Sequence, residues 1–255
     1  MSRDAAAKRA AFRALHAEGC FVVPNPWDLG SLRRLERRGF RALATTSSGS
    51  AWSLGREDGE LSLDETLAHV ALLAAATDLP LNADFENGFA DDPDGVARNV
   101  ALAVRTGVAG LSIEDRARRG ALYDDDVAVR RVAAAREAIA RSGEDVLLVA
   151  RCEAFLADRE DLDFAIARLR AYAGAGADCV YAPGIERLAD AARIVDAVAP
   201  VPVNVLLHTP WTTVDELARA GVRRVSVGGA LAKAAWKAFD AAADALAQRG
   251  TLPGA

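Results

Sequence analysis

The chain has 255 residues, of which 51% are hydrophobic and 26% charged, and its formal net charge is −5. This composition argues against disorder, and the scattered positive charge argues against nucleic acid as a partner, because phosphate binding needs a concentrated basic face. The sequence shows neither the apolar core of a signal peptide nor a run long enough to span a membrane, so we expect a cytoplasmic protein without a membrane partner.

Short apolar runs alternate with helical patterns along the whole chain. An amphipathic helix is predicted first, over residues 4–17. Eight apolar runs then predict strands at residues 20–24, 41–46, 80–83, 108–114, 146–150, 178–182, 201–206 and 222–227. Helical patterns follow these runs at residues 28–38, 64–77, 92–106, 125–141, 160–175, 186–199, 213–220 and 229–248.

Eight successive β-then-α units without a linker predict one domain over residues 1–255, of the α/β class. We expect a (β/α)8 TIM barrel with an extra N-terminal helix. An open doubly wound sheet is the alternative, but it calls for a glycine-rich phosphate turn after the first strand. The sequence has Pro24-Asn25-Pro26-Trp27-Asp28 there. In a barrel, catalytic residues lie at the C-terminal ends of the strands.

Acidic residues follow the third and fourth predicted strands. Asp84 and Glu86 are one residue apart, so they point the same way from an extended segment, and Glu114 ends the next strand. Three acids without histidines or thiolates suit a hard cation, so we predict Mg²⁺, with Mn²⁺ as an alternative. Zinc is disfavoured because His16 and His69 fall in predicted helices. A solvated acidic strand end is the simpler explanation of these residues taken alone.

Two further strand ends carry candidate binding groups. Arg151 ends an apolar strand, where it either pairs with Glu153 or a metal-site acid, or receives an anionic ligand; both can hold at once. The run after the second strand contains Thr46, Ser47 and Ser48, followed by a glycine. Its backbone N–H groups can bind a carboxylate, although such runs are often plain loops.

Seven motifs together resemble the isocitrate lyase/phosphoenolpyruvate mutase superfamily, in the right order and over about residues 20–235. They are Asn25-Pro26-Trp27-Asp28, Thr45-Thr46-Ser47-Ser48, Leu54-Gly55-Arg56-Glu57-Asp58-Gly59, Asp84-Phe85-Glu86-Asn87-Gly88-Phe89, Gly107-Val108-Ala109-Gly110-Leu111-Ser112-Ile113-Glu114-Asp115, Ala150-Arg151-Cys152-Glu153-Ala154-Phe155 and Ala173-Gly174-Ala175-Gly176-Ala177-Asp178. The resemblance implies a Mg²⁺-dependent barrel that makes or breaks a C–C or P–C bond next to a 2-oxo or enolate carboxylate.

The resemblance also implies roles for individual residues. Asp84 binds the metal directly, and Glu86 and Glu114 hold its water molecules. Arg151 balances the charge of an enolate, and Asp58 contacts the reacting end of the substrate. The substrate carboxylate is bound by Thr46, Ser47 and neighbouring amides, with Ser48 in the same run.

Three more residues are candidates for ligand contact because they lie at or near strand ends. Trp27 follows the first strand, and Asn204 and His208 lie at the seventh. His208 either touches the ligand or transfers a proton, or it is an ordinary loop histidine. Trp27 either walls the pocket or packs into the core.

The chain departs from the family pattern in two places. Glu86 replaces the second aspartate of Asp-x-Asp-x-Gly-Tyr-Gly, and Phe89-Ala90 replace its last two residues. Residues 115–123 lack the Lys-Lys-Cys-Gly-His stretch of isocitrate and methylisocitrate lyases, which argues against those substrates, and the Lys-Thr-Asn stretch of phosphonomutases is also missing. We predict either a short lid that meets a dianionic substrate or a solvated loop, formed by Arg116, Arg118, Arg119 and Tyr123.

The sequence therefore predicts a Mg²⁺-dependent lyase-type enzyme that cleaves or forms a C–C bond beside a 2-oxo carboxylate, with a pyruvate-like fragment. Its partner is a small 2-oxo or dicarboxylic acid. The alternatives are a mutase or hydrolase of phosphonopyruvate-like or oxaloacetate-like acids, and a barrel that binds such acids without turnover. By resemblance, the helix over residues 229–248 is exchanged between subunits, which makes the protein a homodimer or homotetramer.

Overall fold

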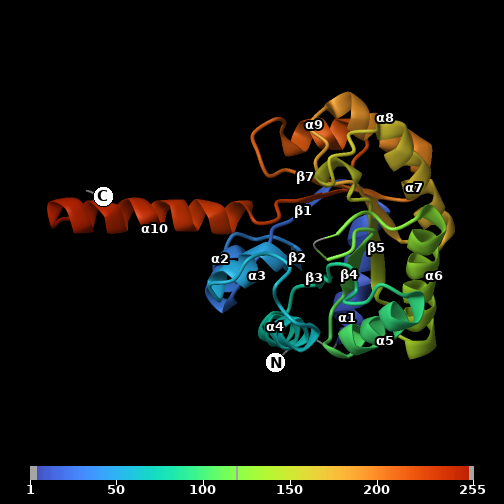
Figure 1. Cartoon of the computed structure of the whole chain (residues 1–255), viewed down its shortest axis with the longest axis horizontal. Coiled ribbons are helices and arrows are strands. Elements are labelled where there is room, and N and C mark those ends of the chain that lie inside the picture. The colour runs from blue at the N-terminus through green and yellow to red at the C-terminus, as the bar shows by residue number, and fades with distance from the viewer. Residues whose placement is uncertain (1–4, 119, 253–255) are drawn as a thin grey trace.

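Eight parallel strands surround the centre of the molecule in the computed structural model, which describes residues 5–118 and 120–252 (Figure 1). They pair in the order β1-β8-β7-β6-β5-β4-β3-β2. Each predicted strand is confirmed, although most are shorter than predicted. The strands are β1 Phe21–Val23, β2 Leu43–Ala44, β3 Leu81–Asp84, β4 Gly110–Glu114, β5 Leu147–Arg151, β6 Cys179–Tyr181, β7 Val203–Leu206 and β8 Arg224–Ser226.

The two ends of the sheet, β1 and β2, meet through a short seam. The Ala44 N–H donates to the Pro24 carbonyl at 3.1 Å, and the Asn25 side-chain amide donates to the Thr45 carbonyl at 2.8 Å. The sheet is therefore a nearly closed barrel. The prediction of a (β/α)8 barrel is confirmed, and the open doubly wound alternative is wrong because its strand order would reverse at a switch point.

Helices follow the strands and cover the outside of the barrel (Figure 1). Each predicted helix is present, and α4 begins with a capping box between Ser62 and Glu65. The predicted helices are observed as α1 Ala5–Ala17, α2 Leu29–Glu36, α4 Leu63–Ala76, α5 Pro93–Arg105, α6 Asp125–Ser142, α7 Leu162–Gly174, α8 Leu188–Val198, α9 Val214–Arg219 and α10 Ala230–Arg249. Two more, α3 Ser47–Ser53 and the 3₁₀ helix η1 Ala154–Leu156, were not predicted.

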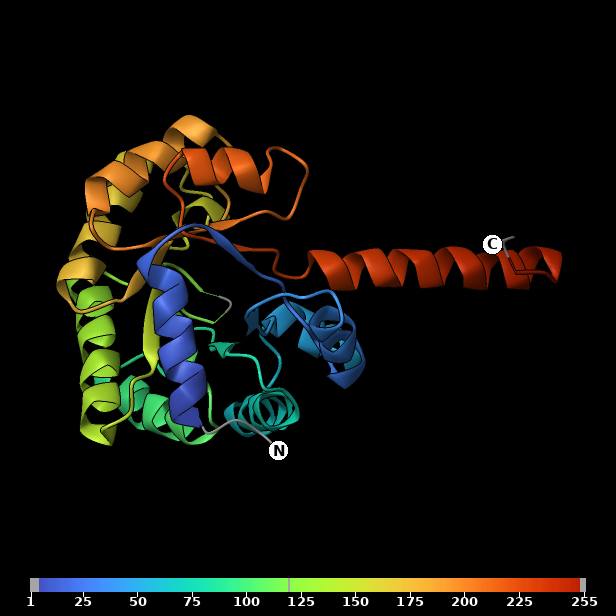
Figure 2. The same cartoon turned by 180° about the vertical axis from the view of Figure 1, so that it is seen from behind.

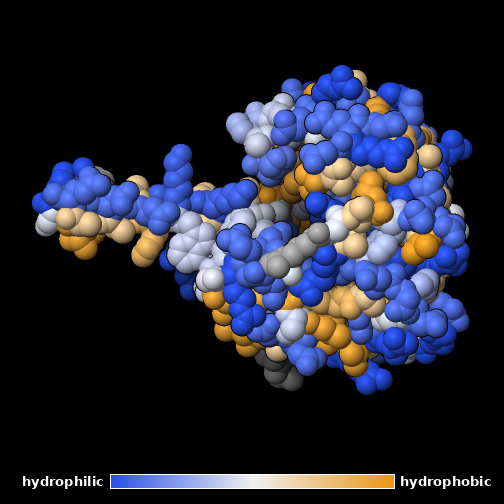
Figure 3. Space-filling view, in the orientation of Figure 1, coloured by the Kyte–Doolittle hydropathy of each residue, from blue (hydrophilic) through white to orange (hydrophobic). Residues whose placement is uncertain are grey.

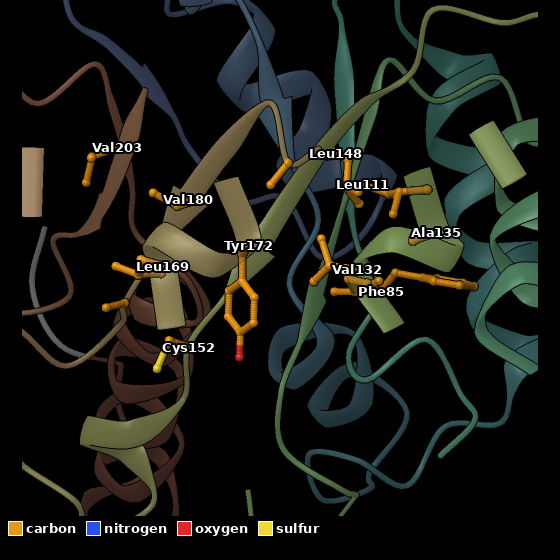
Figure 4. Packing of buried hydrophobic residues seen from close by; sticks show 14 of the residues in the cluster. Phe85, Leu111, Val132, Ala135, Leu148, Cys152, Leu169, Tyr172, Val180 and Val203 are labelled. Carbon is orange, nitrogen blue, oxygen red and sulfur yellow. The ribbon is translucent and has the colours of Figure 1, made fainter. Parts of the chain in front are cut away.

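Alternate strand residues face opposite sides of the barrel wall. The outward side chains pack against the helices, as Figure 4 shows for strand residues Leu111 and Leu148 with Val132 of α6 and Leu169 of α7. The inward side chains differ from the branched apolar layers usual in such barrels. Several are polar: Asn82, Ser112, Tyr181, Arg224 and Ser226. They leave a cavity in the upper part of the barrel.

Helix α1 closes the other end of the barrel. Its Phe12 is fully buried and packs with Phe21 and with strand residues from inside the barrel. Lys8 Nζ donates to the Ala74 carbonyl at 2.8 Å, and Arg9 Nε donates to the Val108 carbonyl at 3.0 Å. Figure 2 shows α1 lying in front of the sheet. The predicted extra N-terminal helix is thus confirmed as the floor of the barrel.

Beyond its first turn, helix α10 does not pack on its own barrel. It projects away from the other elements in both cartoon views (Figures 1 and 2). Its apolar side chains stay exposed, including Trp236 at 38%, Phe239 at 62% and Leu246 at 53%. Figure 3 shows apolar residues along one edge of this helix. None of the helices in the described part of the chain is long and apolar enough to cross a membrane.

Candidate active site

Arg151 stands at the centre of the predicted site, at the C-terminal end of β5. Its Nη1 lies 2.8 Å from Asp84 Oδ1, and its Nη2 lies 2.9 Å from Glu153 Oε1 and 3.4 Å from Glu114 Oε2. All four groups are largely shielded from solvent, so these ion pairs are poorly screened by water. The predicted pairing of Arg151 is confirmed, and its binding of an anionic ligand stays a prediction.

The loop after β2 is tied directly to Asp84. The Ser47 N–H donates to Asp84 Oδ2 at 3.0 Å, and the Asp84 N–H donates to Thr45 Oγ1 at 2.8 Å. The hydroxyl run is not a plain loop, because Thr46 caps the N-terminus of α3 by accepting from the Gly49 N–H at 3.3 Å. Serine and glycine are weak helix formers, and for this reason the sequence pattern did not reveal α3.

Glu86 and Glu114 lie in an environment that disfavours their charges. Burial raises the pKa of Glu86 to about 7, although Arg118 opposes the shift from 3.2 Å away. Burial, followed by repulsion from Glu153, raises the pKa of Glu114 well above its usual range. Nearby arginines thus offset this negative charge only in part, and a divalent cation would offset more of it.

Among residues 5–118 and 120–252, no three His, Cys, Asp or Glu side chains are grouped so that they could hold a metal ion. In part this is because Arg151 takes Asp84 Oδ1 and approaches Glu114. Mg²⁺ usually keeps several waters and binds only one or two protein carboxylates directly. The oxygen donors present therefore fit a hydrated Mg²⁺, and the metal stays a prediction.

Two adjoining cavities open at this end of the barrel, and they share Ser47, Asp58 and Arg151 in their walls. The larger has a volume of about 410 Å³ and the smaller about 310 Å³. Of the predicted site residues, the larger cavity is lined by Thr46, Ser47, Ser48, Asp58, Asp84, Arg151 and His208. The smaller is lined by Ser47, Asp58, Glu86, Glu114 and Arg151. The fold thus brings most of the predicted residues together.

Asp58 lies where the two cavities meet. Loss of surrounding water, followed by repulsion from Asp84, raises its pKa, while a hydrogen bond from Ser47 lowers it. The outer edge of the Asp58 side chain remains exposed. A carboxyl group with a raised pKa at a cavity wall is a candidate for proton transfer to or from a ligand.

The remaining predicted ligand contacts have different surroundings. His208 lines the larger cavity, with its Nε2 3.6 Å from Glu186 Oε1. Asn204 is buried behind the wall, where its side-chain amide donates to Ser226 Oγ at 3.0 Å, so it supports a lining residue. Trp27 lines neither cavity; its Cβ lies close to Gly49 of α3, and its backbone N–H donates to Ser31 Oγ.

The loop after β4 folds over the smaller cavity. Arg116 and Arg118 both line it, and Arg118 also donates to the carbonyls of Gly59 and Leu61. Arg116 Nη1 donates to the Leu156 carbonyl at 3.1 Å. These contacts favour the lid over the solvated loop. Tyr123 turns away and bonds Asn87 and Asp91, and Arg119 lies outside the described residues.

A buried network that the sequence did not reveal supports Arg151 from behind. Asp115 Oδ1 accepts from the Glu153 N–H at 2.8 Å, and its Oδ2 accepts from Tyr172 Oη at 2.6 Å and Arg168 Nη1 at 2.8 Å. Arg168 and Tyr172 both lie on α7, which therefore positions the end of β5. The only local signal was a charged and an aromatic residue on the buried face of a predicted helix.

Comparison with known proteins gives a consistent result. The model of a family described as phosphoenolpyruvate phosphomutase matches residues 12–247. The 2-methylisocitrate lyase of Escherichia coli K12 is 34% identical over 200 residues, covering 73% of this chain and 66% of that enzyme. A structure described as a lyase/mutase from Burkholderia cenocepacia J2315 has a TM-score of 0.94 and 48% identity, covering 98% of this chain and 91% of the other. Oxaloacetate acetylhydrolase, solved with its product oxalate, has a TM-score of 0.88 and 29% identity, covering 99% and 90%.

Proposed function

This chain belongs to the phosphoenolpyruvate phosphomutase family, and we propose that it is a Mg²⁺-dependent lyase that breaks or forms a C–C bond beside a 2-oxo carboxylate. Membership confirms the resemblance seen in the sequence. The observation that carries the proposal is the convergence of Arg151 with three carboxylates, from three strand ends or the loops after them, beside an open cavity. A barrel with only a structural role would not need this cluster, because burying charged groups costs free energy.

We assign the metal to Asp84, Glu86 and Glu114. Asp84 would bind it directly, and the two glutamates would hold its water molecules. The raised pKa values of Glu86 and Glu114 support this assignment, because both groups lack enough positive charge around them. When bound, Mg²⁺ supplies a positive charge that polarises a 2-oxo group and stabilises the enolate form of the pyruvate-like fragment.

The remaining residues would bind and orient the acid. Thr46, Ser47 and Ser48 lie on the cavity wall beside Asp84 and would receive the substrate carboxylate. The Arg151 guanidinium would stabilise the negative charge that develops when the bond breaks. Asp58 lies between the two cavities, where it would contact the reacting end of the substrate.

A hydrolase or mutase acting on an oxaloacetate-like or phosphonopyruvate-like acid is the second candidate. The likeness to oxaloacetate acetylhydrolase extends over 99% of this chain, which favours it. The lid also lacks the cysteine stretch of isocitrate and methylisocitrate lyases. Both candidates use the same metal, carboxylate and arginine groups, and they differ in what the lid supplies.

Proton and phosphorus NMR of the protein with Mg²⁺ distinguishes these reactions. The mixture would hold oxaloacetate, 2-methylisocitrate, dimethylmalate, phosphonopyruvate and phosphoenolpyruvate, with an Asp84→Ala control. With the intact protein alone, growth of pyruvate without phosphate would identify a lyase, oxalate with acetate or pyruvate with phosphate a hydrolase, and interconversion of the phosphonopyruvate and phosphoenolpyruvate signals a mutase. Binding of an acid without turnover of any would favour the acid-binding barrel.

We also propose that α10 docks on a second copy of this chain. The helix leaves its own barrel, and it exposes Trp236, Phe239 and Leu246 at spacings of three and seven residues, which place them on one face. A symmetric exchange would cover this face in both copies at once. Lys233 near the start of α10 lines the larger cavity, so the exchange would also fix one wall of the site.

A further inference from the structure

A second arginine lies inside the barrel, below the cluster around Arg151. Arg224 begins β8, where it pairs in register with Phe21 of β1 and Asn204 of β7. Its side chain is only 3% exposed, yet it contributes to the wall of the 410 Å³ cavity. The sequence alternation in this strand, with Arg224 and Ser226 on one face and Val225 on the other, was the signal that could have revealed it.

This guanidinium is poorly satisfied by the protein. Its Nη1 donates to Asn82 Oδ1 at 3.3 Å, and its Nε has no hydrogen-bond partner in the described part of the chain. Within residues 5–118 and 120–252, no carboxylate lies at ion-pair distance from it. Burial lowers the pKa of Arg224, and the charges of Cys179, Tyr181 and Asp84 oppose this shift only in part. A buried cation without a counter-ion is costly, so such a group usually binds an anionic ligand.

The fold closes every side of Arg224 except the one toward the cavity. The Phe12 ring of α1 lies below it, with its centroid 5.7 Å from the guanidinium carbon. Across the barrel, Gly110 leaves room for Asn82, because a Cβ there would lie 2.9 Å from Asn82 Oδ1. Tyr181 and Ser226 place hydroxyl groups on the cavity wall nearby. The Arg224 guanidinium and the two hydroxyl groups therefore line one part of the cavity, which a small anionic group can enter.

We propose that Arg224 forms the floor of a second anion subsite, which binds the distal carboxylate of a 2-oxo dicarboxylic acid. The inference rests on the proposed function, because the first carboxylate is the one assigned to Ser47 and the metal. Asn82, which Arg224 contacts, precedes Asp84 by two residues, so the two levels are roughly 7 Å apart along the strand. A short dicarboxylic acid can therefore contact the Asp84 level and the Arg224 level at the same time. Arg224 then makes its affinity higher than that of a monocarboxylic acid of equal length.

The test compares two acids that differ only at the far end. The terminal carboxylate of 2-oxoglutarate is a methyl group in 2-oxopentanoate, and oxalate reports binding at the upper level alone. Each is titrated with Mg²⁺ into the wild type, Arg224→Met and Arg224→Lys, following calorimetric heat or the fluorescence of Trp52, which lines the cavity. Thermal unfolding without ligand checks that each variant is folded.

We expect the wild type to bind 2-oxoglutarate about tenfold or more tightly than 2-oxopentanoate. Arg224→Met should abolish this preference and leave oxalate affinity unchanged, while Arg224→Lys, which keeps a charge, should retain part of it. If oxalate binds but the wild type shows no preference, or if folded Arg224→Met keeps the preference, the subsite is wrong and the proposed function stands. If none of the three acids binds to the wild type, the proposed function fails and this inference fails with it.

Discussion

Arg151 lies within ion-pair distance of three carboxylates, so replacing it should have a large effect on activity. In Arg151→Gln the acids Asp84, Glu114 and Glu153 lose their shared cation, and the developing substrate charge loses a donor. We expect kcat for the acid identified by NMR to fall about 10²–10³-fold, the usual cost of removing one stabilising donor.

Lysine at the same position should recover only part of this loss, because one ammonium cannot match a planar guanidinium that bonds several acids. Arg136→Lys serves as the matched control. Arg136 forms an ion pair with Asp178 at 2.8 Å and lines neither cavity. The kcat of the Arg136→Lys variant should therefore stay within about twofold of the wild type. Full activity of Arg151→Gln would contradict the assigned role.

His16 makes stability depend on pH. Burial, with the charge of Arg224 as the next cause, lowers its pKa to about 3, and its Nε2 has no hydrogen-bond partner among the residues that the structure describes. The unfolded chain takes up a proton near pH 6.5, whereas the folded protein does not. His16 should therefore not affect the free energy of unfolding above about pH 6.5. Below that pH it should lower the free energy of unfolding, by about 2 kcal/mol at pH 5.

The check is urea unfolding of the wild type and His16→Phe at pH 7 and pH 5. Phenylalanine keeps a ring against Phe12 and Phe21 but cannot be protonated. Between pH 7 and pH 5, the free energy of unfolding should fall by about 2 kcal/mol less in His16→Phe than in the wild type. Parallel pH profiles for the two proteins would refute the assignment.

At the scale of elements, α7 holds the end of β4 through a buried hydroxyl. Tyr172 Oη donates to Asp115 Oδ2 at 2.6 Å, within the packing seen in Figure 4. Tyr172→Phe should lower the free energy of unfolding by about 1.5–3 kcal/mol, because the bond is to a buried charged group. Tyr123→Phe, at a half-buried position, should cost less than about 1 kcal/mol. Equal losses in the two variants, measured in urea, would mean that burial does not decide the strength of this contact.

At the scale of the whole molecule, α10 should determine the oligomeric state. Trp236 and Phe239 form an edge-to-face pair with ring centroids 6.0 Å apart on its exposed face. Replacing both with serine should shift the mass measured by light scattering toward the monomer. Leu72→Ser, an exposed leucine on α4, controls for general loss of apolar surface. An unchanged mass for the double variant would exclude docking through this face.

Metal binding should stabilise the whole barrel, because Mg²⁺ binds the folded site and not the unfolded chain. At about 100 times its dissociation constant, Mg²⁺ adds about 2.7 kcal/mol, which raises Tm by several degrees in a chain of this size. Asp84→Ala should lose this increment, so its Tm with Mg²⁺ should equal its Tm without Mg²⁺.

Asp145→Asn is the control for this measurement. That acid bonds Arg13 and lines neither cavity, so the Mg²⁺-dependent rise in Tm should survive its replacement. A rise that persists in Asp84→Ala would place the metal elsewhere. Absence of any rise in the wild type would overturn the metal assignment itself.

The sequence alone determined the order and type of the main elements. Alternating apolar runs and amphipathic patterns are local properties, and helix caps such as Ser62 with Glu65 act within one turn. The rule that chemistry lies at the C-terminal ends of parallel strands then placed Asp84, Glu114 and Arg151 together. Their chemical roles stay predictions, because position in the fold does not reveal turnover.

Only the tertiary structure decided which groups face one another inside the barrel. Arg224 and Asn82 are 142 residues apart, and Asp115 and Tyr172 are 57 apart. Such contacts depend on which strands and helices the closed barrel brings opposite one another, and the local pattern around a residue does not specify this. Trp27 shows the same limit, since its strand-end position left a pocket wall and packing into the core both open, and the structure places it against α3. The local sequence thus specified the helices and strands. Burial in the assembled barrel determined which side chains contact one another and how their pKa values shift.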